Sequence, residues 1–268
     1  MAKQLLRTQK LDFAERWLRV ILELNQPPVF LQVVDVDMSK CKTLRQTLKS
    51  AGVPITYTHM LVHAVALALH GLPQHCQLIY GNRRFFPAHV NLSVVVAAGG
   101  FAAPSMKIRR SEQKNLLEIV DEIVVGAPKT RADGERQLAF LRKWGWIVPC
   151  DPLRRLVLRL LQKIDRRLHP DDLVLYGIST SPGIDHFAGL IVDCAGKISS
   201  AIVKDRVVNV DGQMVVRPIW RLTSVVNHLI WDGRMGETFL LRLKTVLEDA
   251  SLVVPESFAW PPVAKSDQ

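Results

Sequence analysis

A histidine, an aspartate and a glycine at positions 228, 232 and 233 have a spacing that could support proton transfer. The segment Leu-Thr-Ser-Val-Val at 222–226 predicts a buried strand that ends just before Asn227 and His228. Asp232 and Gly233 predict a turn, in which glycine lets the chain fold sharply into a helix. A neutral imidazole held at such a junction could take a proton from a thiol or a hydroxyl. Because this spacing also occurs by chance, an ordinary strand-end histidine beside an Asp-Gly turn is the alternative.

Two further histidines, His59 and His63, stand four residues apart in an apolar segment. The segment predicts a buried helix that begins at Thr56 or Thr58 and ends at Gly71. Histidines at this spacing share one helix face and could ligate a metal. No carboxylate or third histidine accompanies them nearby, so we interpret both as packed helix residues and expect no metal.

The composition describes a globular protein with a sizeable core, because 48% of its 268 residues are hydrophobic and 22% are charged. This length suits one large α/β domain or two small ones. The most apolar stretch, 90–104, is interrupted by asparagine, serine and glycine, so no segment predicts a membrane span. Residues 1–10 are polar and lack the apolar block of a signal peptide.

The spacing of the cysteines and the net charge indicate the cellular compartment and the classes of binding partner. The four cysteines lie far apart without a CxxC pair, which indicates a reduced, cytoplasmic protein without a structural zinc site. The net charge of +10 suits polyanionic partners, including nucleic acid or a phosphate-bearing cofactor. Since the sequence contains no nucleic-acid-binding motif, we do not expect nucleic acid as a partner.

Periodicity and turn residues predict a mixture of helices and strands. Helices are expected at 11–24, 39–50, 56–71, 111–125 and 234–247, with Ser39 as an N-cap and Gly52 after the second helix. Strands are expected at 29–36, 77–80, 84–86, 91–98, 173–178, 189–192, 198–203, 207–210, 214–218 and 222–226. Asp211 and Gly212 predict a hairpin turn, and 251–268 a polar tail. Successive hairpin-like strands indicate a single α/β domain, residues 1–268, around a mixed sheet.

Several short motifs accompany the His228 motif in a fixed order between about residues 11 and 247. They are Pro-Val-Phe at 28–30, Val-Asp-Val-Asp-Met at 34–38, Ile-Thr at 55–56, Val-Ala-Leu-Ala-Leu at 65–69, His-Val-Asn-Leu-Ser-Val at 89–94, Leu-Leu-Glu-Ile at 116–119, Val-Asn-Val-Asp-Gly at 208–212 and Val-Arg-Pro at 216–218. In this order they resemble the catalytic core of the dihydrolipoyl acyltransferases of 2-oxoacid dehydrogenase complexes. The stretch near 130–170 is the exception.

This resemblance implies the chloramphenicol-acetyltransferase-like fold, a mixed sheet flanked by helices. It also implies transfer of an acyl group between coenzyme A and a thiol, hydroxyl or amine acceptor. His228 would be the general base, which takes the proton from the thiol of coenzyme A or, in reverse, of dihydrolipoyl. Asp232 would hold the turn through an ion pair with Arg19. The alternative interpretation of Arg19 is an exposed arginine on a helix. Asn227 and Gly233 complete the motif in supporting roles.

The resemblance further implies a hydroxyl group that donates to the oxyanion of the tetrahedral intermediate. Ser179 is the aligned residue, with Thr180 and Ser181 as alternatives; on their own these residues indicate a strand-ending turn. By resemblance the protein forms a homotrimer, or a higher assembly of trimers, with the active site between subunits. The base would come from one subunit and the hydroxyl from its neighbour. Coenzyme A or acyl-CoA would be a substrate, without a metal.

The chain also departs from the family pattern. Dehydrogenase-type members read Asp-His-Arg where this chain reads Asn227-His228-Leu229, and Trp231 stands before Asp232. No lipoyl domain, peripheral-subunit-binding domain or swinging linker precedes the core, so we expect no covalent lipoyl group and a stand-alone acyltransferase. The alternative is a non-catalytic assembly or structural relative, which would not need His228, Asp232 and Ser179.

The stretch 126–172 is basic, contains tryptophans and predicts a helical insertion. Between positions 142 and 168, eight lysines or arginines and two aspartates leave six net positive charges. Asp151 is expected to cap a helix with Pro152 in its first turn. Apolar residues from Leu153 to Leu168 recur at helical spacing, so we expect this stripe to pack on the core with the basic face solvated. The alternative is a docking surface for an acidic partner, for CoA phosphates or for an anionic membrane.

Overall fold

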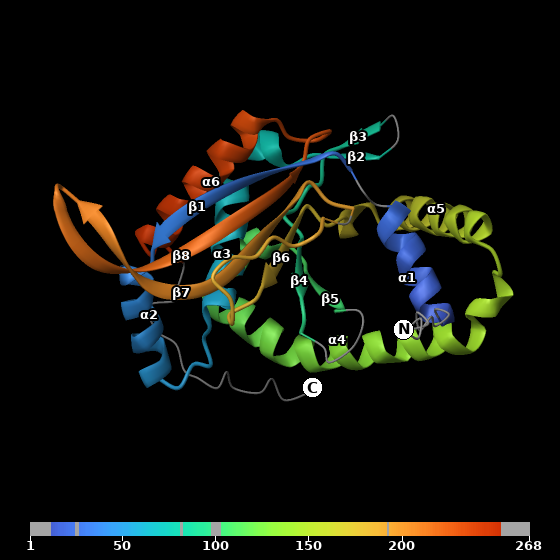
Figure 1. Ribbon diagram of the computed structural model, residues 1–268, viewed down its shortest axis with the longest axis horizontal. Coiled ribbons are helices and arrows are strands. Elements are labelled where there is room, and N and C mark those ends of the chain that lie inside the picture. The colour runs from blue at the N-terminus through green and yellow to red at the C-terminus, as the bar shows by residue number, and fades with distance from the viewer. Residues whose placement is uncertain (1–11, 25–26, 81–82, 98–102, 192, 253–268) are drawn as a thin grey trace, which may run out of the picture.

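A six-stranded mixed sheet with strand order β1-β8-β7-β6-β4-β5 forms the centre of the molecule (Figure 1). The computed structural model describes the chain except for residues 1–11, 25–26, 81–82, 98–102, 192 and 253–268. The strands are β1 (Val29–Asp37), β4 (Leu92–Val95), β5 (Ser105–Ile108), β6 (Tyr176–Thr180), β7 (Gly196–Val210) and β8 (Gln213–Asn227). β4, β6 and β7 run parallel, whereas the other neighbouring pairs are antiparallel. The predicted mixed sheet flanked by helices is confirmed.

The described residues form six α-helices: α1 (Phe13–Leu24), α2 (Ser39–Ser50), α3 (Tyr57–His70), α4 (Leu116–Trp144), α5 (Asp151–Leu168) and α6 (Gly233–Glu248). Short elements connect them: η1 (Pro73–His75), η2 (Ser111–Gln113), η3 (Gly145–Ile147), η4 (Pro170–Asp172) and the hairpin of β2 (Leu78–Tyr80) and β3 (Arg83–Phe85). α3 packs against α4 and α6, and α6 lies on β1. α1 and α5 lie together at the periphery, away from the centre of the sheet (Figure 1).

The main core lies between one face of the sheet and helices α3, α4 and α6. Because strand side chains alternate between faces, Tyr176 and Ile178 of β6 point into this core, together with Leu222 of β8. Nearly every residue of the apolar helix α3 is buried, as its composition predicts. Ser179 comes directly after Ile178 and therefore faces the opposite side of the sheet.

The strands are longer and fewer than the pattern predicts. β7 joins the segments expected at 198–203 and 207–210, and β8 joins those at 214–218 and 222–226. β5 was not predicted, and residues 189–191 are not a strand. The expected hairpin turn is confirmed, since Asp211 and Gly212 have φ of 50° and 85°. The Gly-Gly pair after β4 and most of the expected tail lie outside the described residues.

Two helix predictions need correction. Met38, not Ser39, is the N-cap of α2, and the backbone N–H and hydroxyl of Ser39 both donate to Asp37. The helix predicted at 111–125 begins at Leu116 and continues to Trp144 through Pro128. Contacts with the β4–β5 region accompany this continuation, because the Arg131 guanidinium donates to the carbonyl of Ala97 at 3.0 Å. The expected insertion at 126–172 is therefore helical, but it begins inside α4.

α5 packs differently from the prediction. Its N-cap is Cys150, and Asp151 accepts a hydrogen bond from Arg154 instead of capping the helix. The guanidinium of Arg154 is buried, donates to the carbonyls of Val148 and Pro149, and stands over the ring of Trp17. The apolar stripe is exposed, so the expectation that it packs on the core is wrong. Arg154 is thus a polar anchor that holds α5 to the protein.

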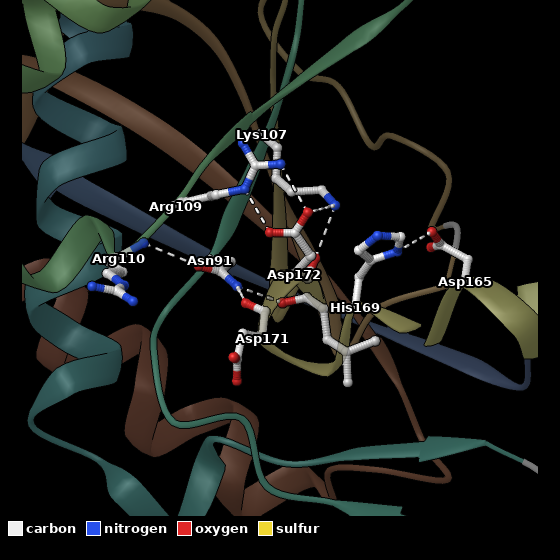
Figure 2. A network of polar contacts seen from close by, with 9 residues as sticks. Asn91, Lys107, Arg109, Arg110, Asp165, His169, Asp171 and Asp172 are labelled. Atoms are coloured by element: carbon white, nitrogen blue, oxygen red, sulfur yellow. Dashed lines mark hydrogen bonds and ion pairs between the residues drawn. The ribbon is translucent and has the colours of Figure 1, made fainter. Parts of the chain in front are cut away.

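A polar network fixes the return of the chain from α5 to β6 (Figure 2). Arg109 of the β5 end pairs with both carboxylate oxygens of Asp172 in η4, at 2.5 and 2.8 Å. This pairing lowers the pKa of Asp172 to about 2. The Asn91 amide donates to the carbonyls of Asp171 and Leu173. β6, which carries Ser179, thus enters the sheet from an anchored turn.

Candidate active site

His228 stands at the end of β8 with its side chain exposed to solvent, although the residues just before it in β8 are buried. Its backbone N–H donates to the carbonyl of Pro28 at 2.9 Å. Its ring packs edge-on against Phe30 of β1, with the ring centroids 4.9 Å apart. The imidazole therefore has a supported position and an accessible edge, as a general base requires.

Asn227 organises the turn that follows. Its side-chain oxygen accepts the backbone N–H of Leu229 at 3.0 Å, and its carbonyl accepts those of Ile230 and Trp231. Its own N–H donates to the carbonyl of Ala195 in the segment before β7. Asn227 replaces the aspartate of the family pattern, and a neutral amide is sufficient for these bonds. The supporting role of Asn227 in the reaction stays a prediction.

The buried side chain of Trp231 fixes the turn that carries His228. Its indole is fully buried, donates to the carbonyl of His75 at 2.9 Å and stacks on Tyr176 with 22° between the ring planes. The ring of His75 donates to the carbonyl of Met235 at 2.9 Å. Burial lowers the pKa of His75, which favours the neutral imidazole. Sequence reasoning missed His75, because a single histidine in a short connecting segment carries no recognisable signal.

Asp232 is the N-cap of α6, and its carboxylate accepts the N–H of Met235 at 2.8 Å. The side chain of Arg19, the expected ion-pair partner, lies outside the described residues, so that pairing stays a prediction. Gly233 does not use the conformational freedom expected of it, because its φ is not positive. Its carbonyl instead accepts the side-chain amide of Gln32 at 2.9 Å.

Ser179 belongs to a row of hydroxyl groups on the sheet face opposite the main core. The strand register places it beside Ser199, which in turn lies beside Thr223. Ser199 accepts the N–H of Gly189 at 2.7 Å, and Thr223 lies 3.4 Å from the ring nitrogen of His186. Within the described part of the chain, the Ser179 hydroxyl makes no hydrogen bond. The residue is buried, with 7% of its surface exposed.

The two alternative hydroxyl residues are placed differently. Thr180 points to the other face of β6, where its hydroxyl lies 3.3 Å from that of Thr58 in α3. Ser181 follows the strand end and is bonded through its backbone, which donates to the carbonyl of Ser200. Within the described residues, the hydroxyl of Thr180 has a side-chain partner, whereas those of Ser179 and Ser181 have none.

Ser179 and His228 do not meet within one chain. Thr223, which shares the row of Ser179, precedes His228 by five residues along β8. At about 3.4 Å per residue this separates the two along the sheet by roughly 17 Å. The strand register therefore keeps the Ser179 hydroxyl and the His228 imidazole apart within one chain.

His59 and His63 lie in the interior of α3. His59 forms a capping box with Thr56, whose backbone N–H donates to the ring at 3.2 Å. Burial lowers the pKa of both histidines to about 4. No cluster of metal-binding side chains occurs in the described residues.

Among the described helices, none has the length and apolarity of a membrane span.

The sequence is similar to one family of acyltransferases. Residues 18–137 match the family "2-oxoacid dehydrogenases acyltransferase (catalytic domain)". The mitochondrial dihydrolipoyllysine-residue succinyltransferase component of 2-oxoglutarate dehydrogenase complex from Saccharomyces cerevisiae is 25% identical over 80% of this chain. The corresponding component from Bartonella vinsonii is 26% identical over 82%. This chain spans only 41% and 48% of the lengths of these relatives.

Solved structures share the fold. A dihydrolipoamide acetyltransferase of Azotobacter vinelandii, studied for the catalytic roles of a serine, a histidine and an asparagine, superposes with a TM-score of 0.69 at 18% identity, covering 91% of this chain and 92% of that one. The cubic core of a pyruvate dehydrogenase multienzyme complex gives 0.64 at 17%, covering 92% and 93%. A chloramphenicol acetyltransferase gives 0.50 at 12%, covering 87% and 94%. Sequence and fold therefore confirm that this chain resembles the acyltransferase catalytic domains of 2-oxoacid dehydrogenase complexes.

Proposed function

We propose that this protein is an acyltransferase that moves an acyl group between coenzyme A and a thiol, hydroxyl or amine acceptor. The observation that carries this proposal is the setting of His228, an exposed imidazole on a turn fixed by Asn227 and Trp231. The relatives named as succinyltransferases support the reaction class. In the Azotobacter vinelandii enzyme the asparagine under study follows the histidine by four residues, and Asp232 occupies that spacing here.

The proposed reaction needs one base and one hydrogen-bond donor. His228 takes the proton from the attacking thiol, and the thiolate adds to the thioester carbonyl carbon. The carbonyl oxygen becomes an oxyanion, to which the Ser179 hydroxyl donates. Collapse of the intermediate breaks the original carbon–sulfur bond, and the leaving thiolate receives the proton held by His228. The acyl group has then moved from one sulfur to the other without net proton release.

The distance between Ser179 and His228 leads us to propose an active site between subunits of a homotrimer. Neighbouring chains would bring the hydroxyl of one subunit to the imidazole of the next. The likeness in fold to the cubic core of a pyruvate dehydrogenase multienzyme complex supports this proposal of an assembly. Coenzyme A would occupy the space between the two chains, without a metal.

Thioester turnover across a panel of acyl-CoAs, with dihydrolipoamide as acceptor, tests the activity. His228→Ala should lower kcat by about 10²–10⁴-fold, because it removes general-base catalysis. His169→Ala is the matched control, since His169 is an exposed histidine at the end of α5, and it should keep wild-type turnover. Equal rates for the wild type and His228→Ala would contradict the assignment.

A folded, assembled protein without turnover on any acyl-CoA would favour the alternative, a non-catalytic assembly relative. Ser179→Ala, by contrast with Ser181→Ala, should lower kcat by about 10²–10³-fold with little change in KM. If only KM changes in Ser179→Ala, the oxyanion donor is a different residue. These two serine variants therefore separate the donor role from general disturbance of the strand end.

A further inference from the structure

Helix α5 turns its apolar side to solvent. The exposed residues recur at the helical spacings of three and four, and each side chain is between 41% and 68% exposed: Leu153, Leu156, Leu160, Leu161, Ile164 and Leu168. An exposed leucine is ordinary by itself, but a continuous stripe of this length marks an interaction surface. α5 lies at the periphery of the molecule, where a large partner can reach it (Figure 1).

The stripe cannot turn inward without breaking the anchors of α5. At one end, buried Arg154 satisfies two backbone carbonyls of the preceding turn. At the other end, Arg166 pairs with Asp193 at 2.8 Å, and its guanidinium lies 3.7 Å from the centre of the Tyr80 ring. These residues lie on the inward side of the helix, about opposite the leucines. The outward orientation of the stripe is therefore built into the fold.

Basic side chains border the stripe. Arg159, Lys163 and Arg167 are exposed and occupy the adjoining side of α5 at helical spacing. The two carboxylates of α5 already have partners, because Asp151 binds Arg154 and Asp165 binds His169. The surface thus combines an apolar stripe with unbalanced positive charge.

The segment that leads into α5 also exposes apolar and basic side chains. Trp144, Trp146 and Ile147 are each between 43% and 58% exposed. Lys143 lies over the ring of Trp144, 5.3 Å from its centre. Tryptophan and basic residues are the side chains that prefer the headgroup level of a lipid bilayer.

We propose that this surface, defined as the stripe of α5 with its basic border and the tryptophan turn, binds an anionic lipid bilayer. The helix lies parallel to the bilayer, with its leucines below the headgroups and Arg159 and Lys163 among the lipid phosphates. A second copy of the same surface is a poorer partner, because a symmetric contact would bring like charges together. The proposal does not depend on the acyltransferase activity.

Flotation of the full chain with vesicles tests the proposal. The wild type should bind phosphatidylcholine vesicles that contain 30% phosphatidylserine and should not bind pure phosphatidylcholine. R159E/K163E should bind at least about 25-fold more weakly, since each lost cation weakens binding about five-fold. K42E/K49E makes the same change of charge on the exposed side of α2 and should bind like the wild type.

A second set of variants tests the apolar stripe. L156Q/L160Q/I164Q should lose vesicle binding, whereas Leu241→Gln, at an exposed apolar position of α6, should retain it. All four positions are exposed, so the variants should fold, and circular dichroism checks this. Failure of the wild type to bind anionic vesicles, or equal binding by all variants, overturns the proposal. If L156Q/L160Q/I164Q instead changes the sedimentation of a protein that binds no vesicles, the stripe is a protein contact and the proposal is wrong.

Discussion

Ser179 in β6 and His228, directly after β8, are held apart by the register of the sheet, roughly 17 Å along the strands at about 3.4 Å per residue. Neither side chain can reach the other by a change of rotamer, because both strands are fixed between neighbours. A reaction that uses both residues therefore needs two chains. This relationship gives the first prediction, which distinguishes a shared site from one within a chain.

Mixed assemblies of two inactive variants should regain activity. When Ser179→Ala and His228→Ala are co-expressed, some interfaces combine the intact imidazole of the first variant with the intact hydroxyl of the second. Random mixing should restore roughly a quarter of the sites of a cyclic trimer. Turnover is measured on the co-purified assembly, with separately purified variants mixed after assembly as the control. No recovery in a verified mixed trimer would exclude the shared site.

Two substitutions of Asp232 should distinguish the effect of its capping hydrogen bond from the effect of its negative charge. Asp232→Ala should lower the free energy of unfolding by about 1 kcal/mol, because the N–H of Met235 loses its acceptor. Asp232→Asn keeps that acceptor and should retain stability, as measured by urea unfolding. If the predicted ion pair with Arg19 also holds the loop, Asp232→Asn and Arg19→Met should both lose turnover. Wild-type turnover in Asp232→Asn would refute the need for the ion pair.

Removal of the Arg154 guanidinium should loosen α5. Arg154→Met leaves the carbonyls of Val148 and Pro149 without their donor and should lower the free energy of unfolding by about 1–3 kcal/mol. Arg159→Met is the matched control on the exposed side of the same helix and should change stability by less than about 0.5 kcal/mol. Equal effects of the two variants in urea unfolding would show that Arg154 is not an anchor.

The buried histidines of α3 should make the protein less stable in mild acid. The pKa of His59 and of His63 is about 4 in the folded protein, below the ordinary value of 6.5. Between these values the unfolded chain binds more protons, so the free energy of unfolding falls as the pH decreases from 6.5 toward 4. Each histidine contributes a slope of up to about 1.4 kcal/mol per pH unit.

The double variant H59Q/H63Q should flatten this dependence, because glutamine does not titrate. Glutamine at position 59 can still serve the capping box with Thr56, which limits other damage to α3. Urea unfolding at pH 7.5, 6.0 and 5.0 compares the variant with the wild type. The same pH dependence in both proteins would mean that other groups cause the acid sensitivity.

The sequence by itself determined the features that depend on neighbouring residues. The turn at Asp211 and Gly212 was predictable because a hairpin turn needs positive φ angles at its centre. The buried helix α3 and the end of β8, just before His228, follow from local patterns of apolar residues. The motif order supplied the fold and the candidate residues, including His228 and Ser179, through the resemblance.

Only the tertiary structure decided how distant segments meet. The contacts of Trp231 with His75 and Tyr176 join residues far apart in the chain. The outward stripe of α5 could not be read from its periodicity, because a period shows that a helix has two sides but not which side faces the protein. The side of α5 that faces the protein is fixed by the hydrogen bonds of Arg154 to a backbone carbonyl and of Arg166 to a carboxylate. The register of the sheet likewise separates Ser179 from His228. This register depends on which strands pair with one another, and the local sequence of a strand does not specify its partner.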